Sequence, residues 1–256
     1  MDEPTLRANS RPFNHFAQNH YSENGEDGVI AEILSRLEIN PNSPKWCVEF
    51  GAWDGKLGSN TFRLVESGYY AVYIESNPER FQLLLNTAKF FPNIVPVCAE
   101  VSYNSSSEDS LNNILNRTQI PSEFEILSID IDSYDLDVWE TFTFYWPKIV
   151  IIEINSSVFP GILQRHSIKT PSNSFSSTLN VGVKKGYTLV CHTGNLIFVR
   201  NDLVHTLMIP QRFIDYPELL FLYDSIWMAG AYPRRTLLSR IIHRLIPVSL
   251  IRILKK

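Results

Sequence analysis

The sequence predicts an α/β fold built around a mostly parallel sheet. Five apolar, strand-like segments alternate with helical segments, which is the order that βα units produce. The last of these strands, 149–154, is nearly all β-branched, as expected of a central parallel strand buried on both faces. Two further strands joined by the turn residues 192–195 predict a closing hairpin, so the sheet should end antiparallel.

Local signals support each element in turn. An apolar face of helical period over 29–37 follows polar residues 21–28, where Ser22 or Asn24 is expected to cap the helix. The acidic residues at the start of that helix either cap it or face a ligand. The long Ser- and Pro-rich loop 155–173 predicts a substrate lid. Strands are predicted over 46–49, 70–75, 94–99, 124–131, 149–154, 187–191 and 196–200, and helices over 60–67, 78–90, 110–115, 134–142 and 175–185.

The loop after the first strand organises the chain. Glu49 ends that strand, at the edge where open α/β sheets place their ligands. Gly51 can adopt a positive φ angle or let a ligand approach the backbone closely, and Gly55 completes a Gly-x-x-x-Gly spacing. A dinucleotide-binding fingerprint would be Gly-x-Gly-x-x-Gly, but residue 53 is Trp. A carboxylate beside such a loop favours a cationic ligand without phosphate.

These motifs resemble those of class I S-adenosylmethionine (SAM)-dependent methyltransferases, and most of all those of the FkbM-type enzymes, many of which act on sugar hydroxyls. The resemblance covers residues 21–203. Residues 49–55 match the family's acidic-x-Gly-x-x-x-Gly motif, and Glu75 matches its acidic residue at the end of the second strand. The resemblance implies a Rossmann-like fold with a seven-stranded, mostly parallel sheet, an antiparallel terminal hairpin strand and helices on both faces.

The same resemblance implies a set of cofactor-binding residues. Glu49 would meet the ammonium group of SAM, directly or through water, above the turn formed by Gly51, Trp53 and Gly55. Glu75 would accept hydrogen bonds from the ribose hydroxyls. Adenine would lie against Glu100 and Val101, after the third strand.

An acidic cluster follows the fourth and fifth strands. Strand alternation puts Asp130 and Asp132 on one side, and Glu153 and Asn155 form a second alternating pair. Four oxygen-bearing side chains at one sheet edge suit Mg²⁺. The pattern resembles metal-dependent sugar O-methyltransferases, in which one Asp helps to remove the proton of the accepting hydroxyl. Those enzymes carry two consecutive Asp residues after strand five, whereas this chain has Glu153, Ile154 and Asn155. A metal-free site in which Asp130 acts as general base therefore stays open.

Other candidates are fewer. His166, in the lid loop, could contact substrate or act as a base, whereas His192 is expected at the surface of the hairpin tip. The three cysteines, Cys47, Cys98 and Cys191, fall in predicted strands and are expected to be buried free thiols in a reducing compartment.

The charge is unevenly distributed. Residues 234–256 hold seven Lys and Arg and no Asp or Glu, so the first 233 residues carry 16 Lys and Arg against 27 Asp and Glu. An acidic body argues against nucleic-acid binding. The N-terminus is polar and no apolar run is long enough to span a bilayer, which favours a cytoplasmic protein.

Four segments are expected: an arm over 1–20, the methyltransferase domain over 21–203, an extension over 204–233 and a basic amphipathic tail over 234–256. The tail either packs on the domain or in a homodimer, or lies on an anionic membrane surface. The favoured function is O-methylation of a hydroxyl on a saccharide or related polyol. A tail that lies on a membrane surface would suit an acceptor that is linked to a lipid. The alternatives are a non-catalytic SAM-binding or interaction domain of a larger assembly and, third, an enzyme with a dinucleotide cofactor.

Overall fold

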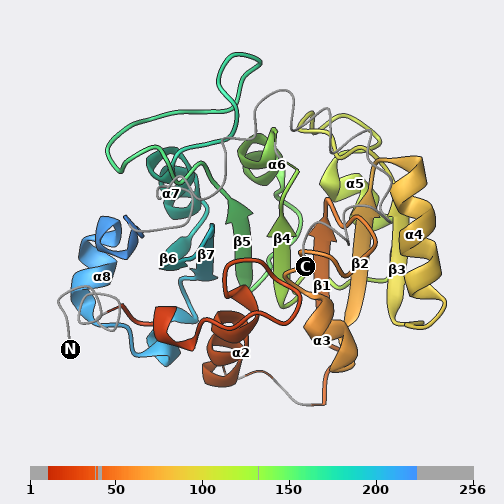
Figure 1. Cartoon of the computed structure of the whole chain (residues 1–256), viewed down its shortest axis with the longest axis horizontal. Coiled ribbons are helices and arrows are strands. Elements are labelled where there is room, and N and C mark those ends of the chain that lie inside the picture. Colours follow the sequence, from red (N-terminus) through yellow and green to blue (C-terminus); the bar gives the residue numbers. More distant parts are fainter. Residues whose placement is uncertain (1–10, 38, 40–41, 132, 224–256) are drawn as a thin grey trace, which may run out of the picture. The chain divides into compact units, whose positions relative to one another are not determined.

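The computed structural model describes residues 11–37, 39, 42–131 and 133–223, and the chain divides after Leu222. The part before that point contains a seven-stranded sheet in the order β3-β2-β1-β4-β5-β7-β6 (Figure 1). Only β7 runs antiparallel, and the hairpin places it between β5 and β6. The strands are β1 (Trp46–Phe50), β2 (Tyr70–Glu75), β3 (Ile94–Cys98), β4 (Ile126–Ile129), β5 (Ile149–Glu153), β6 (Tyr187–His192) and β7 (Asn195–Arg200).

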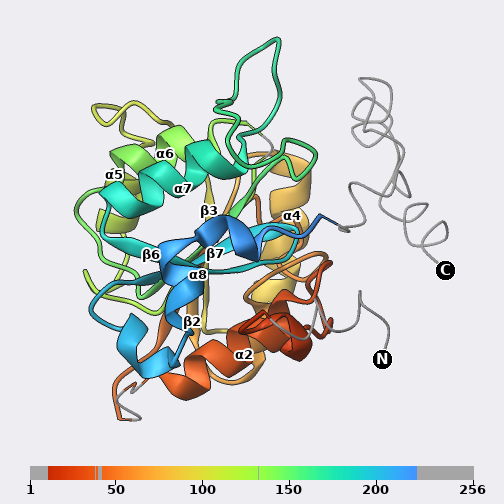
Figure 2. The same ribbon diagram turned by 90° about the vertical axis from the view of Figure 1, so that its left-hand side faces the viewer.

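Helices cover both faces of this sheet. In Figure 2, α5, α6 and α7 lie on one side of the strands and α2 and α4 on the other. The crossovers between parallel strands require this arrangement, since each helix must bury its apolar stripe on the sheet. The helices are α2 (Glu26–Arg36), α3 (Phe62–Glu66), α4 (Pro78–Ala88), α5 (Leu111–Asn116), α6 (Asp135–Thr141), α7 (Phe175–Lys184) and α8 (Gln211–Asp215), with short 3₁₀ turns η1 (Asn14–Phe16), η2 (Val204–Leu207) and η3 (Pro217–Leu220).

The predicted fold class is therefore confirmed, and each predicted strand and helix is present. Every residue of β1 and β4 is buried, which explains why these strands are apolar except for Glu49 and Ser128. The hairpin turn is only Thr193 and Gly194, as the turn residues indicated. The first predicted helix has neither expected cap, because Gly25 occupies its N-cap with a φ angle of 95°.

Two expectations about individual residues were wrong. His192 is completely buried, because segments from both ends of the described chain cover the hairpin. Cys98 is exposed, since β3 is an edge strand and Cys98 is its last residue, whereas Cys47 and Cys191 are buried as expected.

Both flanking segments take part in the core. Phe13, from the predicted arm, is fully buried among the apolar side chains of α2. From the predicted extension, Phe213, Leu220 and Phe221 are buried as well. The described part of the chain therefore folds as one unit well beyond residue 203. The predicted tail, 234–256, lies outside the described residues.

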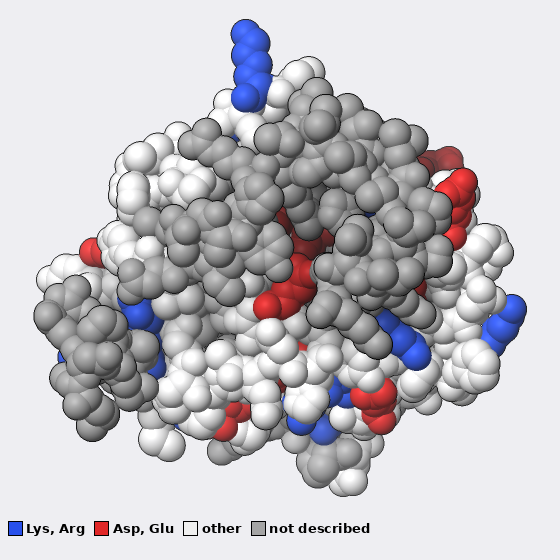
Figure 3. Space-filling model, viewed as in Figure 1, with Lys and Arg blue, Asp and Glu red and all other residues white. Residues whose placement is uncertain are grey.

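Two surface properties bear on function. Asp and Glu side chains gather near the centre of the face seen in Figure 3, as the acidic composition leads one to expect. Of the helices formed by the described residues, none combines the length and the apolar character that a bilayer crossing requires.

Candidate functional site

The predicted site residues lie in one row across the carboxyl edge of the sheet. Glu75, Gly51, Asp130 and Glu153 each follow residues that pair with one another in the β2–β1, β1–β4 and β4–β5 ladders. Glu153 itself pairs with Asn195 of β7. Parallel strands thus bring together residues that are up to 102 positions apart in the sequence, from Gly51 to Glu153, at the edge where α/β sheets bind ligands.

Gly51 makes the turn out of β1 at a φ angle of 80°. A Cβ atom there would lie 1.9 Å from the carbonyl oxygen of Asp130. Its N–H donates to Ile74 O at 3.1 Å, so the turn stays attached to β2. The glycine is needed for backbone conformation and close packing on the next strand, even before any ligand is considered.

Glu75 orients the loop that follows Gly51. Its two carboxylate oxygens accept one backbone N–H each, from Trp53 at 2.9 Å and from Asn77 at 2.7 Å. The side chain is buried at the carboxyl end of β2. Each carboxylate oxygen has a second lone pair, so a diol could still bind the side chain. Its place at the strand end is as predicted; its role as the ribose ligand stays a prediction.

Trp53 stands out in this loop. It is a non-glycine residue with a positive φ angle, 52°, and its ring packs 4.0 Å from the guanidinium carbon of Arg80. Its indole Nε1 is buried and has no hydrogen-bond partner among the described residues. A buried N–H of this kind is costly to leave unpaired, so a ligand oxygen or a water would be bound there. Sequence reasoning missed Arg80, although an Arg one turn into α4 is a common partner for an aromatic ring.

Glu49 turns inward. Its carboxylate accepts hydrogen bonds from Ser59 Oγ at 2.7 Å, the Asn60 N–H at 3.0 Å and Thr61 Oγ1 at 2.5 Å. Burial raises the pKa of Glu49, and these hydrogen bonds act in the opposite direction. The residue holds the second half of the loop against β1, and its contact with a ligand ammonium stays a prediction.

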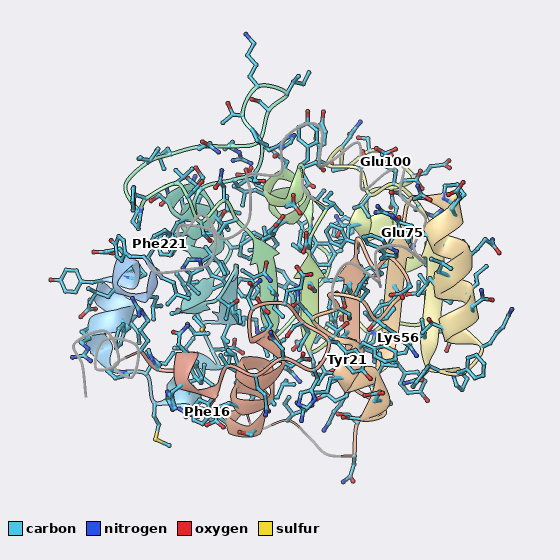
Figure 4. All side chains as sticks on the ribbon, viewed as in Figure 1. Phe16, Tyr21, Lys56, Glu75, Glu100 and Phe221 are labelled. Atoms are coloured by element: carbon cyan, nitrogen blue, oxygen red, sulfur yellow. The ribbon has the colours of Figure 1, made fainter. Side chains whose placement is uncertain are left out.

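The remaining predicted cofactor residues frame the same region. Gly55, at a φ angle of 81°, packs against Leu84 and Tyr73, where a Cβ atom would come within 2.9 Å and 3.3 Å. Glu100 is exposed and Val101 is half-buried, beyond the end of β3. Figure 4 shows Glu100 above Glu75 at the carboxyl edge, so the two carboxylates lie at the same end of the sheet.

The predicted metal ligands are only partly brought together. Asp130 is exposed at the end of β4 and Glu153 is half-buried beside it, on neighbouring strands. The Asn155 carboxamide oxygen instead accepts from the Ser157 N–H at 3.1 Å and from Ser157 Oγ at 2.5 Å. Asp132 lies outside the described residues. Within the described ranges, no group of three or more His, Cys, Asp and Glu side chains could hold a metal ion.

Three aromatic rings converge at the carboxyl edge of the sheet. The rings of Tyr103 and Tyr134 have centroids 4.7 Å apart, and those of Tyr134 and His166 are 4.8 Å apart. They come from three different loops, each of which follows a strand at the carboxyl edge. Tyr103 is 49 % exposed, so part of this aromatic wall faces solvent. The sequence signal that could have identified it is an aromatic residue in each of these loops.

The predicted lid leaves β5 as a loop without regular structure. His166 Nδ1 accepts from the Ser172 N–H at 3.2 Å, so in the neutral ring the proton resides on Nε2. Arg165 ties the loop to α6 through Asp137 at 2.9 Å and Glu140 at 2.7 Å. Apolar side chains of the loop remain exposed, among them Ile162, Leu163 and Ile168.

The acidic residues at the start of α2 have a structural explanation. Asp27 accepts hydrogen bonds from three consecutive backbone N–H groups, those of residues 20–22, and from Ser22 Oγ, all at 2.8 Å. Glu26 is buried and accepts from Thr193 Oγ1 at 2.6 Å and Asn195 Nδ2 at 3.1 Å. These carboxylates fasten the segment before α2 to the hairpin beside the candidate site.

Comparison with known proteins adds structural likeness only. The chain matches no protein-family model and no curated protein. Among solved structures it is similar to a precorrin-6y C5,15-methyltransferase from Geobacter metallireducens, with 11% identity over 72% of this chain and 90% of that one and a TM-score of 0.41. The glycopeptide N-methyltransferase MtfA complexed with sinefungin is 10% identical over 69% of this chain and 93% of that one, with a TM-score of 0.43. The citrinin polyketide synthase CMeT domain is 14% identical over 71% of this chain and 54% of that one, with a TM-score of 0.45. The fold assignment rests on the strand order of the sheet itself.

Proposed function

We propose that this protein is a SAM-dependent O-methyltransferase of the FkbM type that acts on a hydroxyl of a saccharide or related polyol. The observation that carries the proposal is the row of Glu75, Gly51 and Asp130 across three neighbouring strands. In that row a diol-binding carboxylate, a tight glycine turn and an exposed carboxylate are adjacent at the ligand-binding edge.

The cofactor half of the row suits SAM. Glu75 offers acceptor lone pairs for the ribose hydroxyls, and the buried indole N–H of Trp53 offers a donor. Glu49 places negative charge beneath the loop that would hold the methionine part. Glu100 and Val101 continue the same edge toward adenine. When bound, SAM supplies an electrophilic methyl group.

Asp130 serves the acceptor half. A hydroxyl has a pKa far above neutral, so a carboxylate within hydrogen-bond reach lowers the barrier by accepting its proton. The aromatic wall of Tyr103, Tyr134 and His166, on loops at the same sheet edge, offers an aromatic surface for a sugar ring. In this assignment His166 contacts the acceptor, while Asp130 takes the proton.

A metal is not needed in this assignment. Of the four residues proposed as Mg²⁺ ligands, Asn155 has its oxygen occupied by Ser157, and the described side chains provide no group of three. Unchanged turnover in the presence of a chelator would support Asp130 as a base that acts without a metal. Loss of turnover on chelation, restored by Mg²⁺, would transfer the role of Asp130 to a metal site.

Cofactor binding is tested by calorimetry with SAM and with NAD. Glu75→Gln should weaken SAM binding about 5–150-fold, the equivalent of roughly 1–3 kcal/mol for a lost hydrogen-bonding group. The matched control is Glu79→Gln, an exposed carboxylate in the first turn of α4. Wild-type protein that binds NAD in place of SAM would overturn the proposal.

Chemistry is tested by S-adenosylhomocysteine release across a panel of sugar acceptors. Asp130→Asn keeps the shape of the side chain and removes its charge. Turnover should fall on the order of 10²–10⁴-fold with SAM affinity retained. The exposed Asp109→Asn provides the control. A protein that binds SAM but turns over no acceptor would instead favour the rival function, a non-catalytic SAM-binding domain.

A further inference from the structure

A second concave site lies at the opposite edge of the sheet. It has a volume of about 170 Å³ and is lined by residues that include Trp139, Tyr145, Trp146, Tyr187, Lys184 and Lys185. Tyr187 is the first residue of β6, and Trp146 lies three residues before the start of β5. The site is thus at the amino edge, between the last turns of α6 and α7, and away from the row that contains Asp130.

The walls of this cavity are aromatic. The rings of Phe142 and Tyr145 stack at 5.6 Å with an interplanar angle of 2°, and Trp139 packs edge-on to Tyr187 at 5.8 Å. Trp146 is 50 % exposed. A cavity of about 150 Å³ is known to hold benzene, so this one has room for a single six-membered ring. Such walls suit a ring with at least one apolar face.

Two of the residues that line the cavity are lysines. Lys185 is half-buried, and its Nζ donates to Phe142 O at 2.6 Å, which leaves two further N–H bonds on the ammonium. Burial lowers the pKa of Lys185 to about 8, so the group is still mostly charged at neutral pH. Lys184 adds a second ammonium at the same cavity. The hydroxyl of Tyr187 is occupied, since it donates to Pro147 O at 2.7 Å.

Trp139 forms part of the cavity wall, and its side chain is fully buried. Its indole Nε1 is shielded from solvent, so it is not a contact for a ligand in the cavity. The charged groups at this cavity are the ammonium groups of Lys184 and Lys185. The matching ligand therefore carries oxygen acceptors and negative charge on a compact ring.

We propose that this cavity binds a small molecule made of one six-membered ring that bears a carboxylate. The ring lies among the aromatic side chains, and the carboxylate accepts from the ammonium group of Lys185. Two sources share this chemistry, an aromatic acid and a sugar acid. The inference goes beyond the proposed methyltransferase function and does not depend on it.

The test uses the full-length protein and four probes: 4-fluorobenzoate, glucuronate and their neutral counterparts, 4-fluorobenzyl alcohol and glucose. Calorimetry should show binding of at least one carboxylate, at least tenfold tighter than its neutral counterpart. Lys185→Met should weaken that binding at least tenfold, whereas the exposed Lys89→Met should not change it. Binding of glucuronate alone identifies a sugar acid, binding of 4-fluorobenzoate alone an aromatic acid, and binding of both supports the shared chemistry.

A second measurement needs no variant. In ¹⁵N-labelled wild-type protein, the assigned Trp139 indole N–H resonance should shift on carboxylate binding, which keeps the proposal testable if Lys185→Met fails to fold. The proposal is overturned if neither carboxylate binds with a Kd below about 10 mM. It is also overturned if the neutral probes bind equally well or if the Trp139 signal does not move.

Discussion

Acidification should destabilise this fold through one histidine, His192. Its ring is fully buried, Nδ1 accepts from the Leu222 N–H at 2.9 Å, and Nε2 lies 2.9 Å from Ser156 Oγ. The ring also stacks on Phe221 at 4.9 Å. Because Nδ1 is an acceptor, the neutral ring carries its proton on Nε2 and donates it to Ser156. Ser156 and His192 therefore form a structural link, and this histidine is not a base toward the serine.

The magnitude follows from linkage. Burial, with a smaller effect from the positive charge of Arg11, lowers the pKa of His192 from 6.5 to about 3. As the pH falls below 6.5 the unfolded chain takes up the proton first, so stability is lost over the interval from 6.5 down to about 3. Each pH unit in that interval costs about 1.4 kcal/mol, which gives about 2 kcal/mol between pH 7.5 and pH 5.0.

Urea denaturation of wild type and His192→Gln at these two pH values measures the effect. The variant should be less stable at pH 7.5, by about 1–3 kcal/mol for the lost hydrogen bonds. On acidification it should lose about 2 kcal/mol less than wild type, because carboxylates and other histidines titrate equally in both. Equal losses would refute the reasoning. If the variant does not fold, NMR spectroscopy of the wild-type protein provides the same test. The ring proton resonances of His192 should then stay constant down to pH 5.

Two further predictions use matched or truncated variants. In urea denaturation, Gly51→Ala should lower the free energy of unfolding by at least about 2 kcal/mol more than Gly68→Ala does. Both glycines have a positive φ angle, but of the two only Gly51 lies where a Cβ atom would meet backbone, the carbonyl oxygen of Asp130. Equal losses of stability would contradict this. Deletion of residues 234–256 should leave the thermal transition nearly unchanged and abolish sedimentation with anionic liposomes, because the segment carries seven basic residues and no acidic ones. Aggregation or loss of a dimer on deletion would favour the alternative, that the tail packs on the protein.

The fold could be predicted because its signals are local. The strands are apolar runs bounded by turn residues, and the hairpin is marked by Gly194 and its polar neighbours. The positions of Glu75 and Asp130 at the carboxyl edge could be predicted for the same reason, whereas their roles toward a ligand stay predictions. The interpretation of Gly51 was also right in kind, because a positive φ angle at such a turn leaves few other residue types.

Residues whose environment comes from distant segments could not be predicted. His192 is the last residue of β6 and precedes a turn, a position that is usually exposed, but Asn14 and Leu222 approach it from the two ends of the described chain. Cys98 and Cys47 both fall in predicted strands, but Cys98 is exposed at the end of an edge strand and Cys47 is buried in a central one. The side-chain oxygen of Asn155 is of a type that can bind a metal ion, but it accepts a hydrogen bond from the Ser157 N–H instead.

The contact between Gly51 and Asp130 determines how variants at the site can be interpreted. The Gly51 turn would hold the cofactor, and the Asp130 carbonyl that restricts it belongs to the residue proposed to serve the acceptor. Asp130→Asn leaves that carbonyl in place, so a change in turnover reports the carboxylate alone. A substitution at Gly51 displaces both the cofactor turn and the end of β4, so its effects on binding and on turnover are not separable. The two halves of the site are joined through backbone, and side-chain substitutions are therefore the variants that can assign chemistry to either half.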